Sequence, residues 1–333
     1  MRIKYFDNAK GILILFIILG HVFSACADYY GYDDDFFKFC SLFMLQCFFF
    51  ISAYFSSKSK RKLGTRILSM VRIYLVWQII ITIYYSFILK TMNFSLNVLY
   101  PRYTYWFLVT MITYLFLEYI FKRVSYKLMI PISFVLSLAI GFIPFIGEWA
   151  SLARTFTFLP FYVIGFYAKD LNLIEKLQSD KFKKTFIVLS VLILILSLVY
   201  GDILPYRLLR GKYSYYDVTG SLLSVFLKRI IFYVFSIIVS ITFLKITPKK
   251  ETFFTKIGQN TLYIYLMQGA ILKTLVTLNL LPSNIVLGNI LSICILVILT
   301  FVGSKCIIYL KNIIEERMDN IIWIKNFRLL KSH

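Results

Sequence analysis

The sequence predicts an all-α, polytopic integral membrane protein with about ten transmembrane helices and both termini in the cytoplasm. Of its 333 residues, 59% are hydrophobic and only 16% are charged, whereas about half of the residues of a soluble domain are apolar and about a quarter are charged. The apolar residues gather in long runs, which approach the ~20 residues that a helix needs to cross a bilayer. The short alternating segments typical of a membrane β-barrel are not seen in the sequence.

Ten segments are candidate spans, and the basic residues between them predict their orientation. With the amino terminus inside, most of the 37 Lys and Arg residues fall on the cytoplasmic side, as the positive-inside rule requires. We divide the chain into a membrane domain, residues 1–304, and a cytoplasmic extension, residues 305–333, which is partly an amphipathic helix. The spans are residues 8–27, 36–55, 71–90, 104–121, 128–146, 156–171, 185–204, 229–247, 257–276 and 285–304.

The net charge of +21 does not indicate nucleic-acid binding, because the Lys and Arg residues lie between the hydrophobic runs, where they set topology and contact lipid head groups. The five cysteines lack the spacing of a metal site, so neither a metal nor a permanently bound cofactor is predicted. The outer loop at 201–228 is basic and rich in tyrosine. This composition suits a glycan or phosphate-bearing acceptor, and it suits an interfacial aromatic belt equally well.

Three ionisable residues of the first span share one helical stripe: Asp7, Lys10 and His21. At 100° and 1.5 Å per residue, Lys10 and His21 lie within ~20° of each other and ~16 Å apart along the axis. A long donor that enters from the cytoplasm could therefore place its phosphates near Lys10 and its reactive end near His21. The phosphopantetheine arm of coenzyme A has about that reach. A neutral imidazole there could act as a general base or accept the acyl group itself, and the sequence does not select between the two.

Phe6–His21, FDNAKGILILFIILGH, resembles the opening of acyltransferase family 3, the membrane O-acyltransferases that include fucose-4-O-acetylase-like and capsule polysaccharide O-acetyltransferases. Lys10 and His21 match the family's basic residue, ten intervening residues and histidine. Gln268 stands where related proteins usually have His. Further stretches resemble the family in the expected order: Phe48–Phe55, Tyr103–Met111, Arg154–Asp170 and Ile257–Leu272.

The resemblance implies transfer of an acetyl group from acetyl-CoA to a hydroxyl of a cell-surface polysaccharide, or of its lipid-linked precursor, at the bacterial cytoplasmic membrane. It implies His21 as the base, assisted by Asp7 and Lys10. Acetyl-CoA, the carbohydrate acceptor and membrane lipid are then the partners, and a homo-oligomer is left open. The candidate coenzyme A ligands are Lys10, Arg61, Arg66 and Arg154, and the candidate acceptor ligands are Trp106, Arg207, Arg210 and Gln268.

A transporter or flippase for a glycan intermediate explains the helices and the basic outer loop equally well. A glycan polymerase is a second rival, but we expect a longer outer loop in such an enzyme than the 28 residues of 201–228. Other intramembrane polar residues, Gln46 and Gln78 among them, could line a donor tunnel or join helices through hydrogen bonds. We expect Glu118 to snorkel to the inner interface and Glu148 to pair with Arg154 at the outer end of neighbouring spans.

Overall fold

Helices are the only regular secondary structure in the part of the chain that the computed structural model describes, namely residues 3–30, 35–200 and 203–280 with positions 290, 294, 298, 302, 305 and 309. The predicted all-α class is thus confirmed there. Five of its helical segments are long and apolar enough to cross a membrane. The count of about ten spans stays a prediction. The tenth predicted span, 285–304, and the extension, 305–333, lie outside the described residues except for those single positions.

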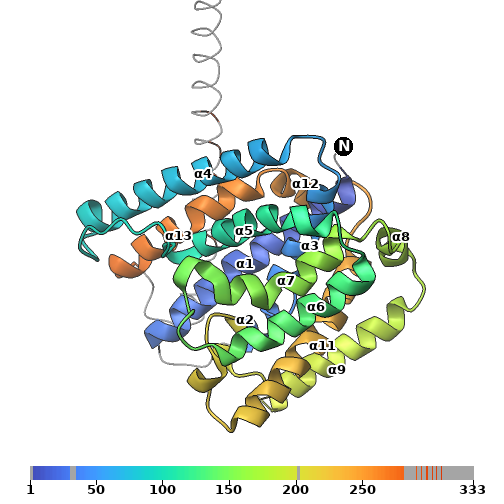
Figure 1. Cartoon of the computed structure of the whole chain (residues 1–333). Helices are drawn as coiled ribbons and strands as arrows, with labels where there is room; N and C mark the ends of the chain where they lie inside the picture. The colour runs from blue at the N-terminus through green and yellow to red at the C-terminus, as the bar shows by residue number, and fades with distance from the viewer. Residues whose placement is uncertain are drawn as a thin grey trace, which may run out of the picture.

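Nine helices of 14 residues or more form the bundle among the described residues, and short elements join them (Figure 1). The longer helices are α1 (Lys4–Tyr30), α3 (Met44–Ser57), α4 (Leu63–Ile83), α5 (Trp106–Phe121), α6 (Tyr126–Ala139), α7 (Leu152–Phe166), α9 (Lys183–Val199), α11 (Leu222–Ile246) and α13 (Thr261–Thr277). The shorter elements are α2 (Asp35–Cys40), the π-helix η1 (Tyr84–Ile88), the 3-10 helices η2 (Tyr103–Tyr105), η3 (Ile140–Phe142), η4 (Trp149–Ser151) and η6 (Tyr215–Asp217), and the short α-helices α8 (Leu173–Gln178), α10 (Tyr206–Leu209) and α12 (Phe253–Gly258).

Several predicted span boundaries differ from the structure, and two of the differences have a clear physical cause. The segment 36–55 is not one helix, because a turn at residues 41–43 separates α2 from α3, and the side-chain amide of Gln46 donates to the Ser41 carbonyl there. The helix predicted from residue 71 begins at Leu63. It continues through the basic residues before the apolar run, because a carboxylate from another helix neutralises Arg66.

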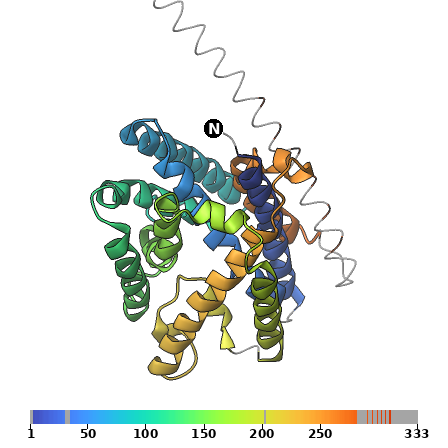
Figure 2. The ribbon, with the colours of Figure 1, turned by 90° about the vertical axis from the view of Figure 1, so that its right-hand side faces the viewer.

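The amino-terminal half of α1 lies against α12 at a backbone distance that only glycine permits (Figures 1 and 2). A Cβ atom on Gly11 would be 2.1 Å from the Phe254 carbonyl oxygen, and one on Gly258 would be 1.7 Å from the Asp7 carbonyl oxygen. Such Cβ atoms would force the two backbones apart. This close approach fixes the position of the turn of α1 that carries Asp7.

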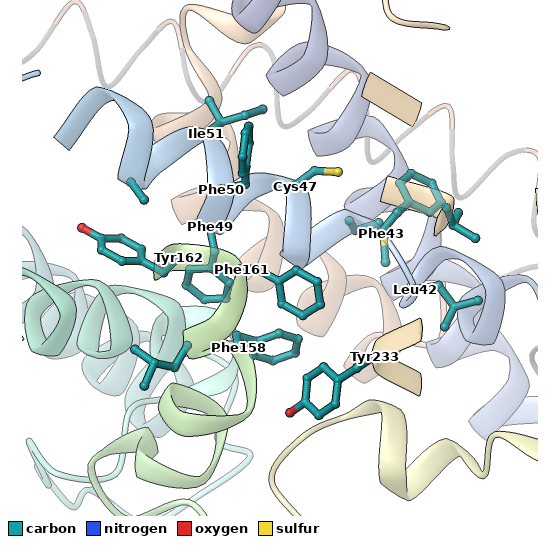
Figure 3. Packing of buried hydrophobic residues seen from close by; sticks show 14 of the residues in the cluster. Leu42, Phe43, Cys47, Phe49, Phe50, Ile51, Phe158, Phe161, Tyr162 and Tyr233 are labelled. Carbon is teal, nitrogen blue, oxygen red and sulfur yellow. The ribbon is translucent and has the colours of Figure 1, made fainter. Parts of the chain in front are cut away.

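Aromatic side chains fill the space between α3 and α7, the centre of the largest core cluster (Figure 3). The Phe49 ring stacks on Phe158 and Phe107, with ring centroids 5.4 and 4.7 Å apart. Gly165 allows α7 to reach the α3 backbone, because a Cβ atom there would be 2.3 Å from the Phe50 carbonyl oxygen. The tight packing on this side leaves the other faces of α3 to line two separate hollows, described below.

Candidate active site

Asp7 and Lys10 form an ion pair on α1, with the Lys10 Nζ 2.8 Å from an Asp7 carboxylate oxygen. The Asp7 side chain is almost fully buried, whereas the Lys10 side chain keeps 23% of its surface exposed. The carboxylate therefore holds the ammonium in position without covering it. The neighbouring Asn8 anchors this turn, because its amide donates to the Pro248 and Lys250 carbonyls and its oxygen accepts from Thr252 and Thr255.

A cavity of about 260 Å³ has both Lys10 and His21 in its lining. The two residues are eleven positions apart on α1, so the cavity follows this helix over ~16 Å. Its walls are mainly apolar side chains of α1, α3 and α5, including Ile14, Phe48 and Met111. Two more of the predicted site residues, Trp106 and Arg210, also line it. A cation and an imidazole thus share one largely apolar passage.

A second hollow of about 550 Å³ lies beside the His21 end of the cavity and is polar. Arg102, Tyr103, Arg154 and Lys212 are in its lining. The Tyr103 ring lies against the imidazole of His21, with a centroid distance of 5.6 Å. The Arg154 guanidinium carbon lies 4.5 Å from the centroid of the Trp106 ring, whose residue lines the inner cavity. The two hollows are therefore neighbours, with the His21–Tyr103 and Arg154–Trp106 contacts between them.

The loop that carries Tyr103 is held on both sides. The Gln78 amide donates to the carbonyls of Asn97 and Tyr100 and accepts from the backbone N–H of Arg102. Gln78 thus joins α4 to this loop. Of the two roles predicted for it, lining a donor tunnel or joining segments through hydrogen bonds, the structure shows the second. Tyr103 itself has a φ of 48°, a left-handed conformation that costs free energy for a residue with a side chain.

Thr104 follows Tyr103 and lines the cavity of His21, yet the sequence analysis did not single it out. Its side chain is buried, and its hydroxyl has no hydrogen-bond partner in the described part of the chain. Its carbonyl accepts from the hydroxyl of Tyr265 on α13. An unsatisfied buried hydroxyl is unusual in a folded protein. Together with the strained backbone of Tyr103 it marks this corner as a site that a ligand would complete.

Other predicted site residues lie away from both hollows. Arg61 is exposed and donates to the Ser69 hydroxyl, and Arg207 donates to the Asp217 carbonyl. Gln268 is buried on α13, and neither atom of its amide has a partner among the described residues.

Arg66 and Glu118 form a second buried ion pair. The guanidinium of Arg66 donates to both carboxylate oxygens of Glu118, at 3.0 and 3.1 Å. Ser56 and Tyr162 donate to the same carboxylate. The expectation that Glu118 snorkels to the interface is therefore wrong, because these donors hold the carboxylate fully buried.

At the outer hollow Glu148 accepts from Lys212, with 2.5 Å between the Lys212 Nζ and a carboxylate oxygen, rather than forming the expected ion pair with Arg154. Burial acts to raise the pKa of Glu148, but the hydrogen bond and charge of Lys212, with Arg154 and Arg210 nearby, lower it below its ordinary value. Arg154 instead donates from Nε to the Arg210 carbonyl at 3.3 Å. Its planar guanidinium is thereby held over Trp106 between the two hollows.

Comparison with known families gives one result that covers most of the chain. A family model described as an acyltransferase domain, that of acyltransferase family 3, matches residues 3–309. The match includes every residue of the two hollows. The comparison with curated proteins gave no match, and neither did the comparison with solved structures.

Proposed function

Because the chain belongs to acyltransferase family 3, we propose that it transfers an acetyl group from acetyl-CoA to a hydroxyl of a cell-surface polysaccharide, or of its lipid-linked precursor, at the bacterial cytoplasmic membrane. The observation that carries the proposal is the pair of neighbouring hollows beside His21. One is narrow and apolar with a cation along it, and the other is polar and cationic. Such a pair suits a long thioester donor from one side and a sugar from the other.

The donor lies along α1. Lys10, oriented by Asp7, pairs with a phosphate of coenzyme A, and the apolar walls take the pantetheine arm. The separation of Lys10 and His21, ~16 Å, brings the thioester to the imidazole. Arg61 and Arg66 are not needed for this arrangement, since one is exposed elsewhere and the other is bound by Glu118.

The acceptor occupies the polar hollow. Arg102, Arg154 and Lys212 give it more positive than negative charge, with Glu148 as the acidic residue of the lining. Tyr100 and Tyr103 offer aromatic faces to a sugar ring. These features favour a glycan that carries carboxylate or phosphate groups. None of the four predicted acceptor ligands lines this hollow. Trp106 and Arg210 line the cavity of His21, where both contact Arg154, and Gln268 and Arg207 lie outside both hollows.

The reaction is a direct transfer. His21 accepts the proton of the acceptor hydroxyl, and the hydroxyl oxygen attacks the thioester carbonyl carbon. The Thr104 hydroxyl, which is otherwise unpartnered, donates to the negative carbonyl oxygen of the tetrahedral intermediate. The C–S bond then breaks, and the coenzyme A sulfur takes the proton from His21. The products are the acetyl ester and free coenzyme A.

His21→Ala is the test, with NMR of the surface polysaccharide as the measurement. We expect the base-labile acetyl signals to disappear while the amount of protein in the membrane is unchanged. His333→Ala is the matched control, since these are the two histidines of the chain, and it should leave acetylation intact. Retained acetylation in the His21 variant would remove His21 from the mechanism. Family membership makes the chain an acyltransferase, so the transporter and polymerase alternatives lose their support.

A further inference from the structure

A third hollow, of about 480 Å³, lies on another face of α3 from the cavity of His21. We call it the α3–α11 groove. Its walls come from α3, α7, α9 and α11, and its apolar side chains include Phe50, Phe161, Ile237 and Ile241. The volume is within the range of small-molecule sites, about 300–1,000 Å³. It shares no lining residue with the cavity of His21 or with the polar hollow, so acyl transfer does not account for it.

The rim of the groove is basic. Lys176, Lys181 and Lys245 are in its lining, and no acidic residue is. The Lys245 ammonium is buried and donates to three backbone carbonyls, those of Lys176, Ser179 and Lys181, at 2.8–2.9 Å. These bonds fix the segment from α8 to α9 over the groove, but carbonyl oxygens do not neutralise the charge. An anion at this rim would therefore gain a favourable electrostatic interaction.

The rim lies at the end of the bundle where the chain begins, because the hydroxyl of Tyr5 donates to the Leu244 carbonyl at 2.8 Å. By the predicted topology this end faces the cytoplasm. Lys245 and Ser240 are five positions apart on α11, so they lie ~7.5 Å apart along the helix axis. That distance matches the thickness of the polar layer of a bilayer leaflet, ~5–7 Å. Ser240 therefore lies near the level of the lipid ester groups when the lysines lie near the phosphates.

Two buried polar atoms in this groove have no partner among the described residues: the hydroxyl of Ser240 and the side-chain oxygen of Gln46. Gln46 uses its amide nitrogen to join α3 to Ser236 of α11, at 3.2 Å, and leaves its oxygen unpaired. Buried polar groups are normally hydrogen-bonded. The ester carbonyl of a lipid would accept from Ser240, and an ester-bound water would donate to Gln46.

We propose that the α3–α11 groove binds one anionic phospholipid of the leaflet that the lysine rim faces. The phosphate pairs with Lys176 and Lys181, and the charge of Lys245 attracts it from behind without a direct hydrogen bond, because the three N–H groups of Lys245 are bound to carbonyls. The ester region meets Ser240, and an acyl chain lies against Phe50, Phe161 and Ile241. The site holds α3, α7 and α11 together from the side opposite to the acyl-transfer cavity. It does not depend on which acyl acceptor the protein uses.

Native mass spectrometry of the full chain, delipidated in detergent and titrated with dioleoyl phosphatidylglycerol or dioleoyl phosphatidylcholine, tests the proposal. We expect the wild type to bind one phosphatidylglycerol more tightly than phosphatidylcholine. Lys181→Gln should weaken the phosphatidylglycerol complex about fivefold and leave the phosphatidylcholine complex unchanged, because one lysine near a lipid surface contributes ~1 kcal/mol. Lys184→Gln is the matched control, since Lys184 is exposed on the next turn and lies outside the groove.

Filling the groove gives the second measurement. Ile241→Trp should abolish the bound lipid without lowering the unfolding temperature, and Ile237→Trp serves if that variant does not fold. Equal affinity for the two lipids, an equal effect of Lys181→Gln and Lys184→Gln, or unchanged lipid binding in the folded tryptophan variant would each overturn the proposal. So would a second copy of the chain that is bound in the groove in place of lipid.

Discussion

Two of the ion pairs in the predicted membrane domain have a buried carboxylate, and their surroundings differ. The Arg66–Glu118 pair is closed: both carboxylate oxygens bind the guanidinium, Ser56 and Tyr162 complete the shell, and the side chains are 11% and 0% exposed. The Asp7–Lys10 pair is open: one contact of 2.8 Å joins it, and Lys10 keeps 23% of its surface, in the lining of the cavity. A buried charged group whose hydrogen-bonding capacity is fully used within the protein has a structural role. A charged group that keeps unused N–H donors can bind a ligand.

The difference corrects an expectation based on residue type alone. Arg66 and Lys10 are both cations near the same predicted interface, so both were candidates for coenzyme A phosphates. In the structure Arg66 pairs with Glu118, which lies on another helix, α5. Lys10 pairs with Asp7, which lies on its own helix and has the shorter acidic side chain. Substitutions that open the closed pair should therefore change stability, and substitutions at the open pair should change substrate binding.

The largest effect is expected at the closed pair. Glu118→Gln leaves the Arg66 guanidinium buried without its counter-charge and should destabilise the fold by about 3–5 kcal/mol. Unfolding in detergent, followed by circular dichroism against temperature, measures this loss. The double variant Glu118→Leu with Arg66→Met removes both charges and should recover most of the stability. If Glu118→Gln unfolds at the wild-type temperature, the pair is not structural.

Thr104→Val should give the opposite signature. The substitution removes a hydroxyl that has no partner, so the unfolding temperature should stay the same or rise. If this hydroxyl stabilises the negative charge of the intermediate, kcat should fall about 100-fold with little change in the KM for acetyl-CoA. Thr104→Ser keeps the hydroxyl and should restore most of the rate. A Thr104→Val enzyme with the wild-type kcat would show that the hydroxyl takes no part in the reaction.

The all-α class and the common helical stripe of Lys10 and His21 could be predicted from the sequence because both depend on local periodicity. The hydrophobic runs indicate helices, and the spacing of Asp7, Lys10 and His21 places them on one stripe of one helix. The cavity that Lys10 and His21 line follows that stripe. These inferences need only the geometry of a single helix.

Contacts between distant segments could not be predicted in this way. The Glu118 carboxylate meets Arg66 across 52 positions of sequence, and Asn8 binds residues 240 and 242 positions away. Thr104 is marked by a missing hydrogen bond and by the left-handed backbone of Tyr103, and both are properties of the folded chain. The turn before α3 depends on Gln46, whose side chain satisfies the Ser41 carbonyl. These contacts and backbone conformations cannot be inferred from the hydrophobic pattern of the sequence.

Lys10→Met tests the open pair and should have a smaller effect than Thr104→Val. Loss of one charge-assisted hydrogen bond to a phosphate should raise the KM for acetyl-CoA roughly tenfold, while kcat changes little. The unfolding temperature should also fall, because the buried Asp7 carboxylate loses its counter-charge. Lys10→Arg keeps the charge and should stay close to the wild type. Lys58→Met is the control, because Lys58 lies outside the cavity and donates to Tyr54. An equal rise in KM in both variants would indicate a general surface charge effect.

The smallest effect is expected at the Glu148–Lys212 pair, where 53% of the Glu148 side chain is exposed. Exposed pairs contribute about 0–1 kcal/mol. Because Lys212 lowers the folded-state pKa of Glu148, any contribution is fully present above the ordinary carboxyl pKa and is lost as the pH falls through the lowered value. Lys212→Met should therefore lower the unfolding temperature slightly at pH 7 and not at all in strong acid. The exposed Lys249 serves as control, and Lys249→Met should show no such pH dependence.

A large loss of stability in Lys212→Met at pH 7 would mean that the exposed fraction of the side chains does not show which ion pairs are structural. The distinction between closed and open pairs would then fail.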